Sequence, residues 1–243
     1  MFHEREAGIT ERVLTRCRSD GQDPYDWTVD ALPATAERII DIGCGNAPLR
    51  DRIGERSWVG VDRSASELRL ARRAGAQPLV LGDATRLGLR GGVGGAALFS
   101  MSLMVATPVA DVVAEVARVV GPEGRLVALM PSSRPLTWGD RIAYGRLLVA
   151  LRQRPRFPEE GVLGDPAAVL AAAGMTVVDD HCRRFVYPVD SRTDAELFVD
   201  ALYLPRVKTA RRAAGSRALA RRGRGLGVAF RRIVARPVAA PNR

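Results

Sequence analysis

The hydrophobic pattern of the chain alternates between short apolar runs and longer amphipathic stretches. The short runs, rich in branched apolar residues, predict strands at 38–43, 58–62, 78–81, 96–99 and 125–130. Between them, apolar residues recur at helical spacing over 64–74 and 108–120. This alternation is typical of βαβ units around a mostly parallel sheet that is covered on both faces. The pattern therefore predicts an α/β fold.

The second half of the chain has a looser pattern. It predicts helices at 138–152 and 166–173, a strand at 175–178 that resumes after a break at 184–187, a helical stretch from 193 interrupted at Pro205, and a last strand at 228–235. In the first half, Thr107 is expected to cap the helix that Pro108 begins. We expect one domain over 31–236, preceded by a helical extension at 1–30 and followed by a tail at 237–243. Within it, 138–152 is interpreted as an inserted, lid-like helix.

Charge is distributed unevenly over the 243 residues. The formal net charge is +10, yet 206–243 hold twelve of the 37 basic residues and no acidic one, which leaves 25 basic and 27 acidic residues before them. The basic helical segment at 206–224 is interpreted as part of a solvated surface connection between the last two strands. A nucleic-acid surface and a membrane-surface helix are the alternatives. Over the wider basic stretch 206–236, Phe230 is the only aromatic residue, and the apolar face consists mostly of small residues.

Cysteine and histidine are too sparse and too scattered for a metal site or a disulfide framework. Cys17, Cys44 and Cys182 are far apart, and the chain has two histidines, so no metal is expected. The uncharged window 91–110 is interpreted as a buried strand with its loops rather than a membrane span. The first residues lack the apolar stretch of a signal peptide, so a cytoplasmic protein is expected.

The chemistry-bearing motif follows the first strand and reads Asp41-Ile42-Gly43-Cys44-Gly45-Asn46-Ala47. A glycine-rich turn lets the backbone approach a nucleotide-like ligand, and a following helix would add free N–H groups. A dinucleotide site would place a third glycine where Pro48 stands. The alternative pattern, G-x-G-x-G with an acid two residues before it, fits Asp41, Gly43 and Gly45.

With these residues the chain resembles the class I S-adenosylmethionine (SAM) methyltransferases, in particular those of ubiquinone and menaquinone biosynthesis. The resemblance is also carried by Asp62 at the end of the second strand, by Gly82-Asp83-Ala84 after the third, and by the turn at 121–126. It implies a seven-stranded, Rossmann-like sheet with an antiparallel last strand. It further implies that Asp62 binds the ribose and Asp83 the adenine amino group. The residues expected to bind SAM are Asp41, Gly43, Cys44, Gly45, Asn46, Asp62, Arg63, Asp83, Ala84 and Ser100.

Two positions depart from the family pattern. Ala47 replaces the third glycine, a change that the turn tolerates if the φ angle there is negative. Gly95 stands before the fourth strand where members of this type usually carry aspartate.

Catalytic and acceptor-binding residues are less clearly marked. The candidates for a general base are His181, His3 and Tyr144, whereas Cys44 is expected to contribute its backbone rather than a nucleophilic thiol. Aromatic and methionine side chains of the predicted roof and strand ends are the candidates for the acceptor pocket: Tyr25, Trp27, Met101, Met104 and Trp138.

The sequence thus predicts an enzyme that transfers a methyl group from SAM to oxygen, nitrogen or carbon of a small molecule. One alternative is an RNA methyltransferase that uses the basic C-terminal segment. Another is a SAM-binding protein without transferase activity, which only Gly95 favours. A nicotinamide enzyme is the most distant alternative.

Overall fold

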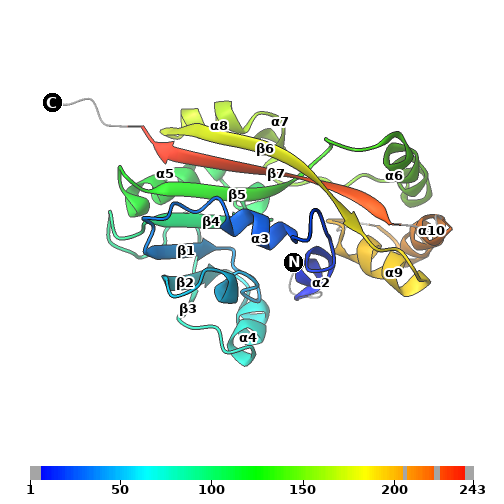
Figure 1. The fold of residues 1–243 in the computed structure, drawn as a ribbon, viewed down its shortest axis with the longest axis horizontal. Helices are drawn as coiled ribbons and strands as arrows, with labels where there is room; N and C mark the ends of the chain where they lie inside the picture. Colours follow the sequence, from blue (N-terminus) through cyan, green and yellow to red (C-terminus); the bar gives the residue numbers. More distant parts are fainter. Residues whose placement is uncertain (1–6, 205–206, 222–224, 239–243) are drawn as a thin grey trace.

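A seven-stranded sheet forms the centre of the molecule (Figure 1). The computed structural model describes residues 7–204, 207–221 and 225–238. The strand order is β3-β2-β1-β4-β5-β7-β6, with β7 antiparallel to both of its neighbours and the other pairs parallel. This confirms the predicted fold class. The strands are β1 (Arg38–Ile42), β2 (Ser57–Asp62), β3 (Leu79–Leu81), β4 (Ala96–Ser100), β5 (Arg125–Ser132), β6 (Met175–Tyr187) and β7 (Leu226–Pro237).

Helices connect the strands and cover the sheet. They are α2 (Ile9–Leu14), α3 (Pro24–Val29), α4 (Ala65–Arg73), α5 (Val109–Val120), α6 (Trp138–Leu151), α7 (Glu160–Gly164), α8 (Pro166–Ala172), α9 (Arg192–Ala201) and α10 (Thr209–Ala220), with single 3₁₀ turns η1 (Arg50–Arg52) and η2 (Leu103–Val105). The predicted helices at 64–74, 108–120, 138–152 and 166–173 all form.

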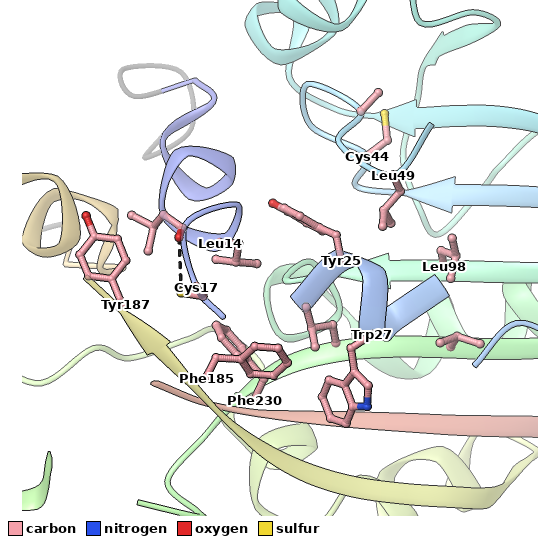
Figure 2. Close-up of a cluster of buried hydrophobic side chains, with 14 of the residues drawn as sticks. Leu14, Cys17, Tyr25, Trp27, Cys44, Leu49, Leu98, Phe185, Tyr187 and Phe230 are labelled. Atoms are coloured by element: carbon pink, nitrogen blue, oxygen red, sulfur yellow. Dashed lines mark hydrogen bonds between the residues drawn. The ribbon is translucent and has the colours of Figure 1, made fainter. Parts of the chain in front are cut away.

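Two hydrophobic clusters occupy the two faces of the sheet. Neighbouring residues of β1 alternate between them, Ile39 in one and Ile40 in the other, as the two-residue period of a strand requires. The apolar residues of α5 pack in the second cluster. In the first, Trp27 of α3 points toward Phe185 and Phe230, while Tyr25 of the same helix points away from them (Figure 2).

The structure corrects two local predictions. Thr107 does not cap α5, because Pro108 takes the N-cap position in an extended conformation and the helix begins at Val109. The predicted break in the sixth strand is also wrong. β6 runs without interruption from Met175 to Tyr187, and a register shift between Val177 and Asp179 accommodates the irregular pattern as a β-bulge.

The extended ends of β6 and β7 carry a group of helices at one end of the molecule, where α6, α9 and α10 gather (Figure 1). α6 begins at a capping box formed by Thr137 and Asp140. Its buried residues Leu147 and Leu151 pack on α10 at Gly215, where a Cβ would lie 2.9 Å from the Leu151 side chain. α6 packs against α10 and contributes no residue to the cavity described below, so the interpretation of 138–152 as a lid stays a prediction that this packing does not support.

No helix within the described ranges combines the length and apolar character needed to cross a bilayer.

Candidate functional site

A cavity of about 540 Å³ opens at the edge of the sheet where the parallel strands end. The residues following β1, β2, β3 and β4 form its floor, which is where ligands bind in open α/β sheets. Segments distant in sequence complete its walls, among them Gly8, Thr10 and Glu11 around α2, Tyr25 of α3, Thr107, Pro158 and Tyr203.

All ten residues predicted to bind the cofactor line this cavity: Asp41, Gly43, Cys44, Gly45, Asn46, Asp62, Arg63, Asp83, Ala84 and Ser100. They lie at four successive strand ends, so the sheet brings them together although they span sixty residues of sequence.

The glycine turn is tied to both neighbouring strands. Gly43 and Cys44 donate their N–H groups to the carbonyl of Val61 in β2, at 2.8 and 3.1 Å. Ser102, which follows β4, donates its hydroxyl to the carbonyl of Ile42 at 2.6 Å. Gly43 has a φ of +67°, and a Cβ there would lie 2.5 Å from the Cβ of Ser102. Both the backbone conformation and the space therefore require glycine at this position.

Two expectations about this turn are wrong. The helix expected after it is reduced to the 3₁₀ turn η1, because only fourteen residues separate β1 from β2 and the first of them form the turn itself. Ala47 has a φ of +63°, so the condition of a negative angle is not met. A buried alanine holds a left-handed conformation here, which costs about 1–2 kcal/mol relative to glycine.

Asp62 links the turn to the helix after β2. Its carboxylate accepts the N–H of Gly45 at 2.8 Å through one oxygen and the N–H of Ser64 at 2.7 Å through the other. Ser64 in turn caps α4 by accepting the N–H of Glu67 at 3.3 Å. A carboxylate offers about four lone-pair positions, so Asp62 can accept two further hydrogen bonds from a ligand in the cavity.

Asp41 is buried, and neither of its carboxylate oxygens makes a well-formed hydrogen bond among the described residues. The same is true of the hydroxyl of Ser100 on the adjacent β4. Burial raises the pKa of Asp41 to about 7, and the nearby Asp62 carboxylate adds to the effect. The indole N–H of Trp58 lies close enough to Asp41 to lower its pKa in part. Two acceptors beside the cavity therefore remain available for a ligand.

Asp83 is exposed at the other end of the floor. Its Oδ1 accepts from the N–H and from the hydroxyl of Thr85, both at 2.8 Å, and these bonds lower its pKa. Its second oxygen accepts no hydrogen bond from the described residues, which leaves an ionised acceptor at the rim of the cavity.

Glu11 and Glu67 are two cavity residues that the sequence analysis missed. Glu67 accepts the N–H of Gly8, the N-cap of α2, at 3.2 Å, and burial raises its pKa to about 7. Glu11 of α2 accepts from the side-chain amide of Asn46, and burial raises its pKa too. In the sequence, Glu67 stands three residues after Ser64, the spacing of a capping box. That spacing predicts a local role at the start of α4 and gives no indication of the long-range contact with Gly8.

The predicted acceptor and base residues separate into two groups. Tyr25 and Met101 line the cavity, and Met101 is one of the few non-glycine residues with a positive φ, +58°. The others lie elsewhere. Trp27 and Met104 are buried in the two hydrophobic clusters, Tyr144 packs against Phe198, and Trp138 is exposed on α6.

The histidines do not reach the cavity within the described residues. His181 lies exposed on β6, the last strand of the sheet, where it pairs with Asp179 at 2.7 Å. His3 lies outside the residues that the structure describes.

Cys44 and Gly95 have structural explanations. Burial raises the pKa of the Cys44 thiol far above its usual range, so the reactive thiolate is suppressed. At Gly95 a Cβ would lie 2.9 Å from the Cα of Ala36, so the backbone approach excludes aspartate. Gly95 precedes β4 and thus lies at the edge of the sheet opposite the cavity, which removes its support for a protein without transferase activity.

The cavity suits a cationic ligand with hydrogen-bond donors. Five carboxylates and one arginine line it: Glu11, Asp41, Asp62, Glu67, Asp83 and Arg63. Among the described residues no group of three histidine, cysteine or acidic side chains is arranged to hold a metal ion. The unpartnered oxygens of Asp41 and the hydroxyl of Ser100 add acceptors that no protein donor occupies. A sulfonium ligand with ammonium and hydroxyl donors matches this set of acceptors.

Comparisons with known proteins agree with this geometry. Residues 40–128 match the family model described as a methyltransferase domain. No curated protein matches the chain by sequence. Among solved structures, a putative type II methyltransferase from Anaeromyxobacter dehalogenans shares 17% identity over 90% of this chain and 96% of its own, with a TM-score of 0.63.

Two further structures have the same fold. The [4+2]-cyclase SpnF shares 20% identity over 91% of this chain and 85% of its own, with a TM-score of 0.57. A SAM-dependent methyltransferase from Methanosarcina mazei shares 16% identity over 87% and 97%, with a TM-score of 0.53. The strand order and the acidic residues at successive strand ends agree with the match of residues 40–128 to a methyltransferase domain, and the fold of the chain is that of the class I SAM-dependent methyltransferases.

Proposed function

We propose that the protein transfers the methyl group of SAM to a small molecule bound in the same cavity. This proposal rests on one observation: the cavity has acidic and glycine residues on its floor and different side chains on its other walls. Its floor holds the acidic and glycine residues at the strand ends, while Tyr25, Met101, Thr107 and Tyr203 line other parts of it. Its volume of about 540 Å³ falls in the range of sites for small ligands.

The proposed cofactor contacts follow from the available acceptors. Asp62 accepts from the ribose hydroxyls with the lone pairs that Gly45 and Ser64 leave, and Asp83 accepts from the adenine amino group. Asp41 and Ser100 supply acceptors near the glycine turn. The close approach of the backbone at Gly43 and Gly45 leaves room for the ligand.

The protein's contribution to the reaction is mainly alignment and exclusion of water. Bound SAM supplies a methyl group already activated by the positive charge of its sulfur. The walls contributed by α2 and Tyr25 hold an acceptor against it, in line with the bond that breaks. The surrounding carboxylates favour a cationic ligand over the product with a neutral sulfur, which promotes product release.

A general base is needed only for an acceptor that holds its proton at neutral pH. Glu11 and Glu67 are the cavity residues best suited, because burial raises the pKa of both carboxyl groups toward the working range. They replace His181 and Tyr144 in this proposal, since neither of those side chains lines the cavity.

A second function is favoured by the comparison with the [4+2]-cyclase SpnF, whose fold is the same. In that alternative this cavity also serves a reaction other than methyl transfer. Formation of S-adenosylhomocysteine with an acceptor supports the transferase, whereas tight SAM binding with no such product from any acceptor supports the alternative.

The first experiment is calorimetric titration of S-adenosylhomocysteine into the wild-type protein and the Asp62→Ala variant, with NADH as the ligand control. We expect micromolar binding that the substitution weakens by about 2–4 kcal/mol, or roughly 30- to 1000-fold, because a buried acceptor of several hydrogen bonds is lost. Asp51→Ala, at an exposed residue of η1, is the matched control and should bind as the wild type does. Equal binding by Asp62→Ala would overturn the assignment, provided thermal unfolding shows both variants folded.

A further inference from the structure

One side of helix α6 is apolar and exposed, although the opposite side packs on α10. Trp138, Ile142, Gly145 and Val149 recur at intervals of four, three and four residues, which places them on one side of the helix. Trp138 and Val149 are each 77% exposed and Ile142 is 43% exposed. The opposite side buries Leu147 and Leu151 against α10. α6 is thus apolar on two sides, and packing within the described chain accounts for only one of them.

Arginines border this exposed face. By the 3.6-residue period, Arg146 lies on one side of the apolar row and Arg141 on the other, while Arg152 ends the helix. Residues 133–158 contain a single acid, Asp140, which is fully buried and paired with Arg184 at 2.8 Å. The face is therefore apolar at its centre and cationic around it, with no acidic side chain to offset the charge.

α10 extends the positive charge. It packs against α6, and Lys208 at its N-cap, Arg211 in its first turn and Arg217 in its last turn are exposed. Residues 206–243 contain no acidic residue. Three exposed cations of the C-terminal sequence therefore lie on the helix beside α6, while Arg231 and Arg232 are on β7, where they pair with Asp180 and Asp179. The apolar face needed by a surface helix, which that segment lacks, is supplied by α6 instead.

We propose that the exposed face of α6 forms a docking surface for an anionic lipid bilayer, with the cations of α10 adding to the positive charge of that end of the molecule. Tryptophan and aliphatic side chains at the centre of a helix face enter the boundary between headgroups and acyl chains, and arginines at its edges bind the anionic headgroups. Two other occupants fit less well. Aliphatic side chains such as Ile142 and Val149 offer no platform for stacking nucleic-acid bases. A second copy of the same face would bring two sets of arginines together.

A short segment of chain connects α6 with the cavity wall. After α6 the chain passes through exposed Arg154 and Arg156 to Phe157, which stacks on Tyr203 with ring centroids 5.3 Å apart. Tyr203 and the next residue, Pro158, both line the cavity. Docking of α6 would therefore hold one wall of the cavity near the membrane, which suits an acceptor that resides in the bilayer.

Tryptophan fluorescence tests this proposal directly. The chain has three tryptophans, and Trp27 and Trp58 are buried, so a change of emission on adding vesicles reports on Trp138. We expect a blue shift and co-sedimentation with vesicles of phosphatidylcholine and phosphatidylglycerol, little response to phosphatidylcholine alone, and release at high salt. The measurement needs neither SAM nor transferase activity, so its outcome is independent of the proposed reaction.

Matched variants separate the apolar and the cationic contributions. Val149→Glu should lower vesicle binding at least about tenfold, whereas Val178→Glu, at an exposed valine of β6, should leave it unchanged. The double variant Arg141→Gln/Arg146→Gln should lose at least about tenfold, and Arg72→Gln/Arg73→Gln on α4 should not.

Binding that is equal across these variants, or absent from anionic vesicles, would overturn the proposal. So would binding of single-stranded RNA in preference to vesicles with the same dependence on Arg141 and Arg146, or concentration-dependent dimerisation that Val149→Glu abolishes.

Discussion

At Gly43 the backbone and the neighbouring side chain separately exclude a Cβ. The φ angle of +67° is unfavourable for any other residue, and the Cβ of Ser102 would be only 2.5 Å away. Gly54 offers the matching case, because its φ is +68° and nothing lies within 4 Å of the position of a Cβ. Gly43 and Gly54 thus have nearly the same φ angle, but only at Gly43 would a Cβ collide with a neighbouring side chain.

We predict that Gly43→Ala lowers the free energy of unfolding by about 2–5 kcal/mol, as the sum of the left-handed backbone cost and overpacking. Gly54→Ala should lose only the backbone cost of about 1–2 kcal/mol. Urea unfolding of both variants measures the difference. Ser102→Gly in the Gly43→Ala background should restore part of the loss, and an absence of any restoration would locate the crowding elsewhere.

The type of a residue predicted its place in the cavity where that residue stands at the end of a predicted strand. Asp41, Asp62 and Asp83 each follow an apolar run, and all three line the cavity. Glu67 could not be found in this way, because its contact with Gly8 joins residues 59 positions apart. Ala47 shows the opposite difficulty: its type suggests an ordinary φ angle, while the turn imposes +63°.

At the scale of elements, one buried carboxylate fastens α6 to the ends of β6 and β7. Asp140 pairs with Arg184 of β6 at 2.8 Å and accepts the N–H of Gly227 in β7 at 2.9 Å. It also accepts from Thr137 at the start of α6. Although burial alone would raise the pKa of Asp140, these hydrogen bonds hold it well below its usual range.

We predict that Asp140→Asn lowers the free energy of unfolding by about 3 kcal/mol, at the lower end for a broken buried ion pair since Arg184 is partly exposed. Asp200→Asn, in a partly exposed pair with Arg212 at 3.5 Å, should cost less than about 1 kcal/mol. Because the folded-state pKa of Asp140 is depressed, its contribution is present above pH 4 and is lost as the pH falls through that pKa. Equal effects of the two substitutions in urea unfolding at pH 7 would contradict this account.

Helix periodicity predicted α6 but not its position. The pattern identifies a helix with apolar residues on more than one side, and a lid over a pocket is one way to use such a helix. The choice between a lid and a surface helix depends on what the long β6 and β7 strands bring near it. That arrangement rests on the Asp140 contacts, which join residues 44 and 87 positions apart.

At the scale of the whole molecule, the sheet gathers more negative charge around the cavity than any single segment carries. Asp41 is the clearest case: its pKa is about 7 in the folded protein and close to 3.8 when exposed. Between these values the folded state keeps a proton that the unfolded state has lost. The free energy of unfolding contributed by Asp41 therefore falls as the pH rises from about 4 to 7.

We predict that Asp41→Asn, which cannot ionise, gains stability relative to the wild type when the pH is raised from 5 to 8, by up to about 3 kcal/mol. Urea unfolding without SAM at the two pH values measures the change. Asp51→Asn in the exposed η1 turn is the control and should follow the wild type at both. An unchanged difference between Asp41→Asn and the wild type would show that Asp41 is already ionised in the fold.

The sequence by itself determined the sheet, the glycine turn and the acidic residues at the strand ends. These are local properties: the two-residue period of a strand, the need for glycine at a crowded left-handed turn, and the order of strands along the chain. Only the tertiary structure decided which side chains complete the cavity and which face of α6 stays exposed. Glu11, Tyr25, Pro158 and Tyr203 meet there because four separate segments converge at one edge of the sheet, and sequence spacing holds no record of that convergence.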